Sequence, residues 1–424
     1  MSLDPTTTEL SGPARWSVVA ISLLISASSF LFVNGVAFLM PSLETAREVP
    51  LTQASVLASM PSWGMVTSLI AWGVVLDRFG ERIVMTAGSA LTALAAYAAA
   101  SSESLLGIAV FLFLGGVAAG SCNNAGGRLV AGWFPPQRRG LAMGVRQTAQ
   151  PLGIALGALI MPDLAEHGVQ QALMFPGLVC AVAGMAAFIG ITEPPRITRE
   201  AATAEQLANP YRGSSTLWRI HAVSALLMMP QAVTVTFMLV WLVGNGGWSV
   251  TAAGLAMMIA QLLGASGRVL VGRWSDRIGS RMQPVALIAG ASALTLFLLA
   301  WADAASSWWR VPLMMTISVL AVLDNGLQAT AITELAGQFW SGRALGIQNT
   351  TQRLAAAAGP SALGLLITAA KYPHAWAMCG LFPLFALPLV PLKLRPSGLA
   401  DQSAAAIRSP TSRVERRAEP RVAK

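Results

Sequence analysis

The chain has 424 residues, of which 54% are hydrophobic and only 11% are charged, and its net charge is +9. Soluble domains usually carry about 25% charged residues, so this composition excludes an ordinary soluble protein and predicts a chain largely surrounded by lipid. The positive charges lie in short polar segments between apolar stretches. There they favour a role in membrane orientation over a nucleic-acid partner.

Apolar stretches long enough to cross a bilayer follow one another along most of the chain. A spanning helix needs roughly 20 apolar residues, and a lipid-exposed backbone must satisfy its own hydrogen bonds. The first stretch is longer than the apolar core of a signal peptide, so we expect it to be retained. Twelve helical spans are predicted, at residues 16–40, 53–75, 83–102, 105–132, 141–162, 171–191, 217–243, 249–271, 283–302, 310–336, 343–369 and 375–394.

Alternate loops between these spans differ in positive charge. Lysine and arginine in short loops favour the cytoplasmic side, so the basic set predicts cytoplasmic loops and two cytoplasmic termini in an inner membrane. The poorer set holds mainly Arg47, Arg310 and Lys371. The richer set holds Arg78, Arg82, Arg138, Arg139, Arg196, Arg199, Arg212, Arg277, Arg281 and Arg343.

A charged phrase occurs once in each half of the chain. Residues 73–82 and residues 272–281 both have the pattern G-x-x-x-D-R-x-G-x-R, and each lies between two predicted spans. A second pair of similar segments, residues 142–150 and 344–352, follows at corresponding places. Six spans in each half give both halves the same orientation, which predicts a parallel repeat about an axis along the membrane normal.

The domain organisation follows from this repeat. A polar stretch midway along the chain reads as the linker between halves, and the Ser-, Ala-, Pro- and Arg-rich end reads as a disordered basic tail. The predicted parts are a cytoplasmic N-terminus (1–15), a first six-helix bundle (16–191), a cytoplasmic linker (192–216), a second six-helix bundle (217–395) and a cytoplasmic tail (396–424).

The two charged phrases in a twelve-span chain resemble the major facilitator superfamily over nearly the whole length. The resemblance implies an all-α membrane protein with two six-helix bundles related by a pseudo-two-fold axis along the membrane normal. It also implies a central cavity lined by helices 1, 4, 7 and 10, and alternating access. We therefore expect a secondary active transporter for a small polar or anionic solute, coupled to protons.

Two departures bear on the class of substrate. Drug antiporters of this family usually carry an arginine early in helix 4, where this chain has Leu112. They also carry G-P-x-x-G-G in helix 5, where this chain has Gln150, Pro151, Leu152 and Gly153. Both departures weaken an interpretation as a drug or metabolite efflux antiporter, which stays open as an alternative. A transporter-like receptor that carries no solute is the alternative from another class.

Polar residues inside the predicted spans are costly in lipid and therefore mark candidate contacts with a solute. Arginines among them favour carboxylate or phosphate, because a guanidinium donates in a planar fork. The competing interpretation is that these side chains only hydrogen-bond one helix to another. The candidate binding residues are Asn123, Asn124, Arg146, Gln150, Gln231, Asp324, Asn325, Gln328, Gln352 and Arg353.

Asp324 is the acid predicted nearest to the centre of a span. Burial of a carboxyl group favours its protonated form and makes it a candidate for proton coupling. The alternative is a permanent salt bridge from Asp324 to Arg146 or Arg353. The sequence leaves both open.

Charged residues at the inner ends of the spans are predicted to form a cytoplasmic gate. Ion pairs there can close the inner face in one state and break in the other. Arg128 and Arg268 are expected to lie close to the phrases that contain Asp77 and Asp276. The gate residues are Asp77, Arg78, Gly80, Arg82, Arg128, Arg268, Asp276, Arg277, Gly279 and Arg281.

No catalytic or nucleotide-binding motif occurs in the sequence, so neither an enzyme nor a bound cofactor is expected. Cys122, Cys180 and Cys379 lie in apolar stretches and the three histidines are scattered, so no metal site is expected. The expected partners are a small-molecule substrate, the lipid bilayer and protons, with the protein acting as a monomer.

Overall fold

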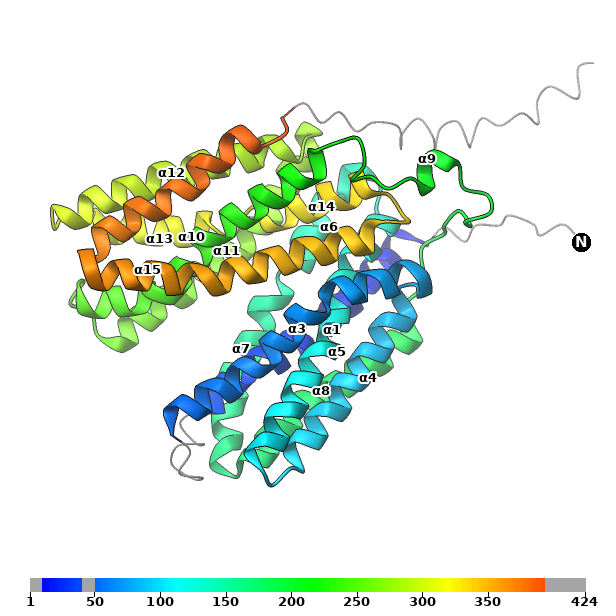
Figure 1. The fold of residues 1–424 in the computed structure, drawn as a ribbon, viewed down its shortest axis with the longest axis horizontal. Helices are drawn as coiled ribbons and strands as arrows, with labels where there is room; N and C mark the ends of the chain where they lie inside the picture. Colours follow the sequence, from blue (N-terminus) through cyan, green and yellow to red (C-terminus); the bar gives the residue numbers. More distant parts are fainter. Residues whose placement is uncertain (1–9, 40–49, 393–424) are drawn as a thin grey trace, which may run out of the picture. The chain divides into compact units, whose positions relative to one another are not determined.

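A computed structural model describes residues 10–39 and 50–392. All regular elements in those residues are helices, and they form two bundles (Figure 1). Arg47 and the predicted tail lie outside the described residues. The first half contains α1 (Gly12–Gly35), η1 (Val36–Leu39), α3 (Leu51–Phe79), α4 (Glu81–Ala100), α5 (Leu105–Trp133), α6 (Pro136–Arg146), α7 (Ala149–Glu166) and α8 (Val169–Gly190).

The second half begins after a linker that contains the single-turn helix α9 (Ala204–Leu207). Each half has its own apolar core, built from large side chains such as Leu31 and Leu112 in the first and Trp241 and Trp376 in the second. The helices of the second half are α10 (Thr216–Gly244), α11 (Val250–Ile278), α12 (Met282–Ala304), α13 (Arg310–Leu320), α14 (Asn325–Ala336), α15 (Ser341–Ala386) and η2 (Leu387–Leu389).

Ten helical stretches among the described residues are long and apolar enough to cross a membrane, and they correspond to the first ten predicted spans. The last two predicted spans lie in α15, a segment of 46 residues whose backbone leaves the helical conformation at Lys371 (φ 70°, ψ 167°). The chain turns back on itself after the orange helix in Figure 1. The segment therefore supplies two spans and completes the twelve-helix arrangement.

Two of the predicted spans are interrupted. The fifth is divided between α6 and α7 at Gln147 and Thr148, and the tenth is divided between α13 and α14 at residues 321–324. Pro151 has no N–H to donate to the carbonyl of Gln147, which explains the first interruption. In the second, Asp324 begins α14, and short polar side chains of this kind disfavour the interior of a helix.

The predicted spans placed most of each charged phrase in a loop. In the structure, the first part of each phrase lies instead at the end of a helix. Helix α3 continues through Asp77 and Arg78, and α11 continues through Asp276. Gly80 (φ 83°) and Gly279 (φ 66°) follow with positive φ, a conformation that glycine adopts without steric cost. The acidic residues are therefore held rigidly on the last turns of two helices.

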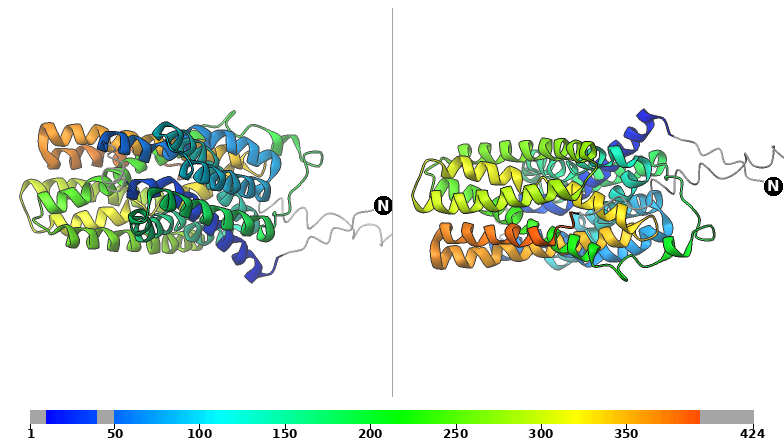
Figure 2. Two further views of the ribbon diagram at one scale, coloured as in Figure 1. Left: turned by 90° about the horizontal axis from the view of Figure 1, so that it is seen from below. Right: turned by 90° about the horizontal axis from the view of Figure 1, so that it is seen from above.

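The linker follows the end of α8 and precedes α10, and we call this end of the bundles the linker end. Both views in Figure 2 place the linker beyond the helices at one end. Glu193 accepts a hydrogen bond from the Arg82 backbone N–H (3.3 Å), whereas the carbonyl of Ile197 accepts one from the Gln338 side chain (3.1 Å). The indole of Trp340 donates to the carbonyl of Leu207 (3.3 Å). The linker is thus tied to both halves.

Candidate functional site

Arg268 of α11 joins the two interrupted spans. Its Nε donates to the carbonyl of Val322 (2.9 Å) and its Nη1 donates to the carbonyl of Gln147 (2.8 Å). Both carbonyls lie where a helix is broken, so the buried guanidinium satisfies acceptors that the helices leave open. Arg268 was expected close to the phrase that contains Asp276, and in the structure its guanidinium bonds these two carbonyls, one of which belongs to the opposite half.

Asp324 lies at the start of α14 and is 2% exposed. One carboxylate oxygen accepts a hydrogen bond from the side chain of Gln328 (2.7 Å). The Arg268 guanidinium lies within electrostatic reach of this carboxylate, but the two form no ion pair in the described residues. In the part of the chain that the structure describes, Asp324 forms no ion pair with Arg146 or Arg353. The predicted alternative of such a salt bridge is therefore wrong for this conformation.

Three amide side chains link α10, α14 and α15. Asn325 donates to Gln231 (3.0 Å) and accepts from Gln352 (3.4 Å). Asn325 and Gln352 are only half-buried, whereas Gln231 is buried. The structure thus brings together three predicted site residues that lie far apart in the sequence. Each amide retains further donors and acceptors, because one contact uses only part of its capacity.

A second pair of amides joins the two halves. Asn124 of α5 donates to the carbonyl of Leu69 (2.6 Å) and accepts from the side chain of Asn349 in α15 (2.9 Å). The side chain of Asn123 is half-buried and forms no hydrogen bond within the described residues, and the same holds for the side chain of Gln150. Hence Asn124, and not its neighbour, carries the contact between halves.

Sequence reasoning did not include Asn349 and Gln147 among the site residues. Both contribute to contacts between the halves, Asn349 through its side chain and Gln147 through its carbonyl. The two occupy equivalent positions in the repeated segments 142–150 and 344–352. Polar residues at matched positions of the repeat were therefore the signal that could have identified them.

Arg146 and Arg353 carry two positive charges into the interior of the bundles. Arg146 is 4% exposed, and its guanidinium donates to Gln147 Oε1 (3.1 Å) and to the sulfur of Met143 (3.3 Å). The guanidinium of Arg353 lies over the ring of Phe30 in α1, 5.4 Å from its centroid. Within residues 10–39 and 50–392, neither arginine forms an ion pair with an acid. Both charges thus lack a counter-ion within that part.

Several buried polar atoms of α1, α14 and α15 have no hydrogen-bond partner in the described part of the chain. A Cβ added at Gly126 would lie 2.7 Å from the hydroxyl of Ser22 and 3.1 Å from Cδ of Arg146, so these side chains flank the same glycine. Buried polar groups are normally satisfied, so such a group of atoms is suited to a polar ligand. The atoms are the hydroxyls of Ser22, Ser26 and Thr350 and the side-chain carbonyls of Gln328 and Gln348.

At the linker end, the acid of each charged phrase binds the opposite half. Asp77 accepts hydrogen bonds from the backbone N–H groups of Gly342 (2.9 Å) and Arg343 (3.1 Å), in the first turn of α15. A helix N-terminus presents free N–H groups and a partial positive charge, so a carboxylate is favourable there. Arg128 and Arg343 also lie near this carboxylate, at 3.8 and 3.5 Å.

Asp276 makes the matching contact in the other direction. Its two oxygens accept hydrogen bonds from the N–H groups of Gly140 (2.9 Å) and Leu141 (2.8 Å) in α6. Arg281 donates to Asp276 (2.6 Å) and to Glu334 (3.1 Å). Burial lowers the pKa of Arg281, but Glu334 and Asp276 outweigh it and raise the pKa above its ordinary value. The two acids therefore bind the halves together in a pseudo-symmetric pair of contacts.

Glycines allow the helices to approach closely beside these contacts. A Cβ at Gly140 would lie 2.4 Å from the carbonyl oxygen of Gly272, and one at Gly342 would lie 2.6 Å from that of Gly73. Gly144 and Gly346 follow one turn later and meet the backbone of α11 and α3 in the same way. Small residues at such spacing let membrane helices pack backbone to backbone.

The basic residues of the predicted gate do not all join the halves. Arg128 does, since it donates to the carbonyl of Gln338 (3.1 Å). Arg82 is exposed and donates to the carbonyl of Phe188 within its own half (2.8 Å). Arg78 and Arg277 are exposed and form no hydrogen bond to the opposite half within the described residues. Within the described residues, the three exposed arginines of the predicted gate therefore form no hydrogen bond between the halves.

A family comparison and a close relative both connect this chain to one family of membrane transporters. The family described as Major Facilitator Superfamily matches residues 22–360. An uncharacterized MFS-type transporter of Mycobacterium tuberculosis (strain ATCC 25618 / H37Rv) is 67% identical over 403 residues, which cover 95% of this chain and 90% of the relative.

Two more distant similarities extend along the chain. A probable galactarate/D-glucarate transporter of Escherichia coli (strain K12) is 24% identical over 395 residues, covering 84% of this chain and 88% of that protein. The solved structure of the proton:xylose symporter XylE superposes with a TM-score of 0.74 at 16% identity, covering 93% of this chain and all (100%) of that chain. At this identity the second likeness concerns the fold alone.

Proposed function

Because this chain belongs to the major facilitator superfamily, we propose that it is a secondary active transporter that carries a small anionic or polar solute by alternating access. The observation that carries the substrate class is the pair Arg146 and Arg353, which have no acidic partner within the described residues. An uncompensated charge in a low-dielectric interior is costly, and an anionic solute would supply the missing counter-charge.

The chemistry around the two arginines suits a carboxylate or a similar oxyanion. A guanidinium donates in a planar fork that matches the two oxygens of a carboxylate. Amides of Asn325 and Gln352 and hydroxyls of Ser22 and Ser26 supply further hydrogen-bonding groups. The E. coli relative is described as a transporter of galactarate and D-glucarate, which are carboxylates, and this supports the same substrate class.

Proton coupling is proposed for Asp324. A buried carboxyl group near a single cation can change its protonation when the environment of that cation changes. Arg268 is such a cation, and its hydrogen bonds reach both halves. Movement of one half against the other would break the bond to Gln147 and so alter the charge near Asp324. This links rearrangement of the halves to proton uptake and release.

The contacts of Asp77 and Asp276 are proposed to form the gate at the linker end. Both are made between halves, so both must break when that end opens. The conformation described here would then be closed at the linker end. On this proposal the protein resides in the inner membrane as a monomer, with the linker end facing the cytoplasm.

Both termini are expected to face the cytoplasm, because the arginine-rich loops lie at the linker end. A reporter that is active only in the cytoplasm, fused after Lys424, should give a signal. The same reporter inserted near Arg310 should be silent, and a periplasmic reporter at Arg310 should be active. A periplasmic signal after Lys424 would contradict the twelve-span orientation.

Replacing Arg146 or Arg353 by Gln is expected to weaken binding of an anionic solute by roughly 10- to 150-fold, since hydrogen bonds to charged groups contribute about 1.5–3 kcal/mol. A thermal-shift screen of small mono- and dicarboxylates, phosphates and neutral sugars first identifies solutes that stabilise the wild-type protein. Titration of the hits then compares the variants.

Arg219→Gln is the matched control, because this half-buried arginine in the first turn of α10 bonds the carbonyls of Leu389 and Pro388. It should bind the hits like the wild type. A screen in which only neutral or cationic compounds stabilise the protein would contradict the anionic substrate class. Hits that bind Arg146→Gln and Arg353→Gln with unchanged affinity would remove both arginines from the site. Flux of a hit in proteoliposomes, with and without a proton gradient, tests transport itself.

A further inference from the structure

A basic cavity lies at the linker end, apart from the interior polar residues. Its volume is about 410 Å³. Trp16 of α1 and Arg138 of α6 line it from the first half, and Arg273, Asp276 and Arg277 of α11 line it from the second. The cavity is therefore built from both halves.

The charge of this cavity is strongly positive. Arg138, Arg273 and Arg277 are exposed, and none of them forms an ion pair with an acid in the described residues. Asp276 also lines the cavity, but its carboxylate is compensated by Arg281 (2.6 Å) and by two backbone N–H groups. Three uncompensated guanidinium groups around one cavity provide the donors and the field that a phosphate group requires.

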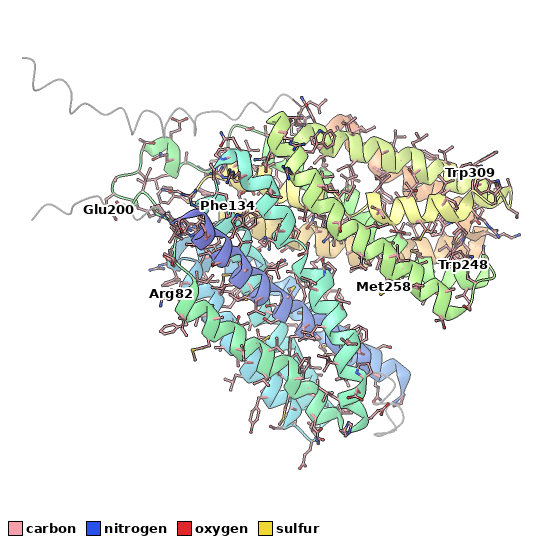
Figure 3. The ribbon with its side chains drawn as sticks, turned by 180° about the vertical axis from the view of Figure 1, so that it is seen from behind. Arg82, Phe134, Glu200, Trp248, Met258 and Trp309 are labelled. Carbon is pink, nitrogen blue, oxygen red and sulfur yellow. The ribbon has the colours of Figure 1, made fainter. Side chains whose placement is uncertain are left out.

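A smaller and more apolar cavity shares two of these side chains. It has a volume of about 190 Å³ and is lined by Gly12, Arg15, Trp16, Phe134, Pro135 and Arg138. The rings of Trp16 and Phe134 meet edge to face at 5.2 Å. Figure 3 places Phe134 at the end of the bundles that also carries Glu200 of the linker and Arg82. Tryptophan is enriched where a membrane helix meets the headgroup layer.

We propose that the basic cavity binds the phosphate of an anionic phospholipid from the leaflet at the linker end, with the glycerol and upper acyl region against Trp16 and Phe134. Basic pockets between helices on the cytoplasmic side are suited to anionic headgroups. The paired aromatic rings of Trp16 and Phe134 beside the arginines favour a lipid over a soluble phosphate compound. The inference rests on the proposed orientation of the helices but not on the proposed solute.

The lipid acts on the conformational equilibrium because the cavity needs both halves. Arg138 lies two residues before Gly140, whose N–H binds Asp276, and Arg273 and Arg277 flank Asp276 on α11. A ligand that binds only while α6 and α11 are together stabilises the state closed at the linker end. Anionic lipid therefore supports the Asp276 contact and biases the transporter toward that state.

The test compares wild-type protein, Arg138→Gln/Arg273→Gln and the charge-matched control Arg199→Gln/Arg212→Gln. The two control arginines are exposed on the linker and do not line either cavity. Each protein is placed in nanodiscs of phosphatidylcholine with rising fractions of phosphatidylglycerol, and the midpoint of thermal unfolding is measured. In parallel, glycerol phosphate and inorganic phosphate are titrated into the detergent-solubilised protein.

For the wild type and the control we expect a rise of the midpoint that saturates with phosphatidylglycerol. In the cavity variant the fraction needed for half of the effect should increase about tenfold or more. An equal response of all three proteins would overturn the proposal. Free glycerol phosphate or inorganic phosphate could raise the unfolding midpoint as much as the lipid does. That result would overturn the lipid as the ligand and assign the cavity to a soluble phosphate compound. The experiment measures lipid binding and not transport. A negative result for the lipid is therefore distinguishable from failure of the protein to transport any solute.

Discussion

Asp77→Asn is expected to reduce transport strongly while leaving membrane insertion and folding intact. The carboxylate accepts from both Gly342 and Arg343, whereas an asparagine offers one acceptor oxygen and an NH2 group that cannot accept. One hydrogen bond and the favourable charge at the N-terminus of α15 are lost. Hydrogen bonds to charged groups contribute about 1.5–3 kcal/mol, so the equilibrium should shift roughly tenfold or more toward the state open at the linker end.

Two quantities are measured: the flux of solute and the distance between spin labels on the two halves. Spin labels at Arg78 and Arg277, exposed residues of opposite halves, should show a larger population of long distances in Asp77→Asn than in the wild type. Asp163→Asn is the control, since Asp163 is exposed near the far end of α7, and it should leave both flux and distances unchanged. Wild-type flux in a well-expressed Asp77→Asn protein would contradict the proposed gate.

Asp324→Asn is expected to abolish accumulation driven by a proton gradient and to retain exchange of solute across the membrane. The asparagine can still accept a hydrogen bond from Gln328, as the carboxylate does, but it cannot take up and release a proton. Accumulation and exchange of a labelled solute are measured in the same proteoliposomes. Asp303→Asn is the matched control, because this buried acid of the same half accepts from the indoles of Trp241 and Trp376, a role that an amide oxygen can fill.

Two outcomes would contradict the coupling role. Unchanged gradient-driven uptake by a stable Asp324→Asn protein would exclude Asp324 as the coupling group. If Asp324 instead acts as the structural counter-charge of Arg268, the variant should lose roughly 3–5 kcal/mol of stability. In that case Arg268→Gln, combined with Asp324→Asn, should restore part of the unfolding midpoint. The coupling role predicts neither the loss nor the rescue.

Much of the fold could be predicted from the sequence because the bilayer restricts it so strongly. Lipid requires apolar helices of a minimum length, so hydropathy alone identified all twelve spans. The repeated phrases identified the two halves and predicted that Asp77 and Asp276 occupy equivalent positions in them. The resemblance to the major facilitator superfamily added the arrangement of two bundles, which the family match and the fold comparison confirm.

The partners of the polar side chains were decided only by the tertiary structure. Hydropathy does not specify how each helix is rotated or where it breaks, and both determine which side chains meet. The sequence left open whether Asp324 pairs with Arg146 or Arg353, whereas in the structure its carboxylate accepts a hydrogen bond from Gln328. Arg268 was expected near the end of α11, yet it donates hydrogen bonds to two carbonyls at the positions where helices are interrupted.

The sequence by itself determined the membrane class, the number of spans and the equivalent positions of the two acids at the linker end, because these follow from composition and from repetition along the chain. Tertiary structure decided that each acid binds the first turns of a helix in the opposite half, that Arg78 and Arg82 take no part in this contact, and that three arginines surround one cavity. Such contacts join residues more than 100 positions apart, and only the packing of helices against one another brings them within hydrogen-bonding distance.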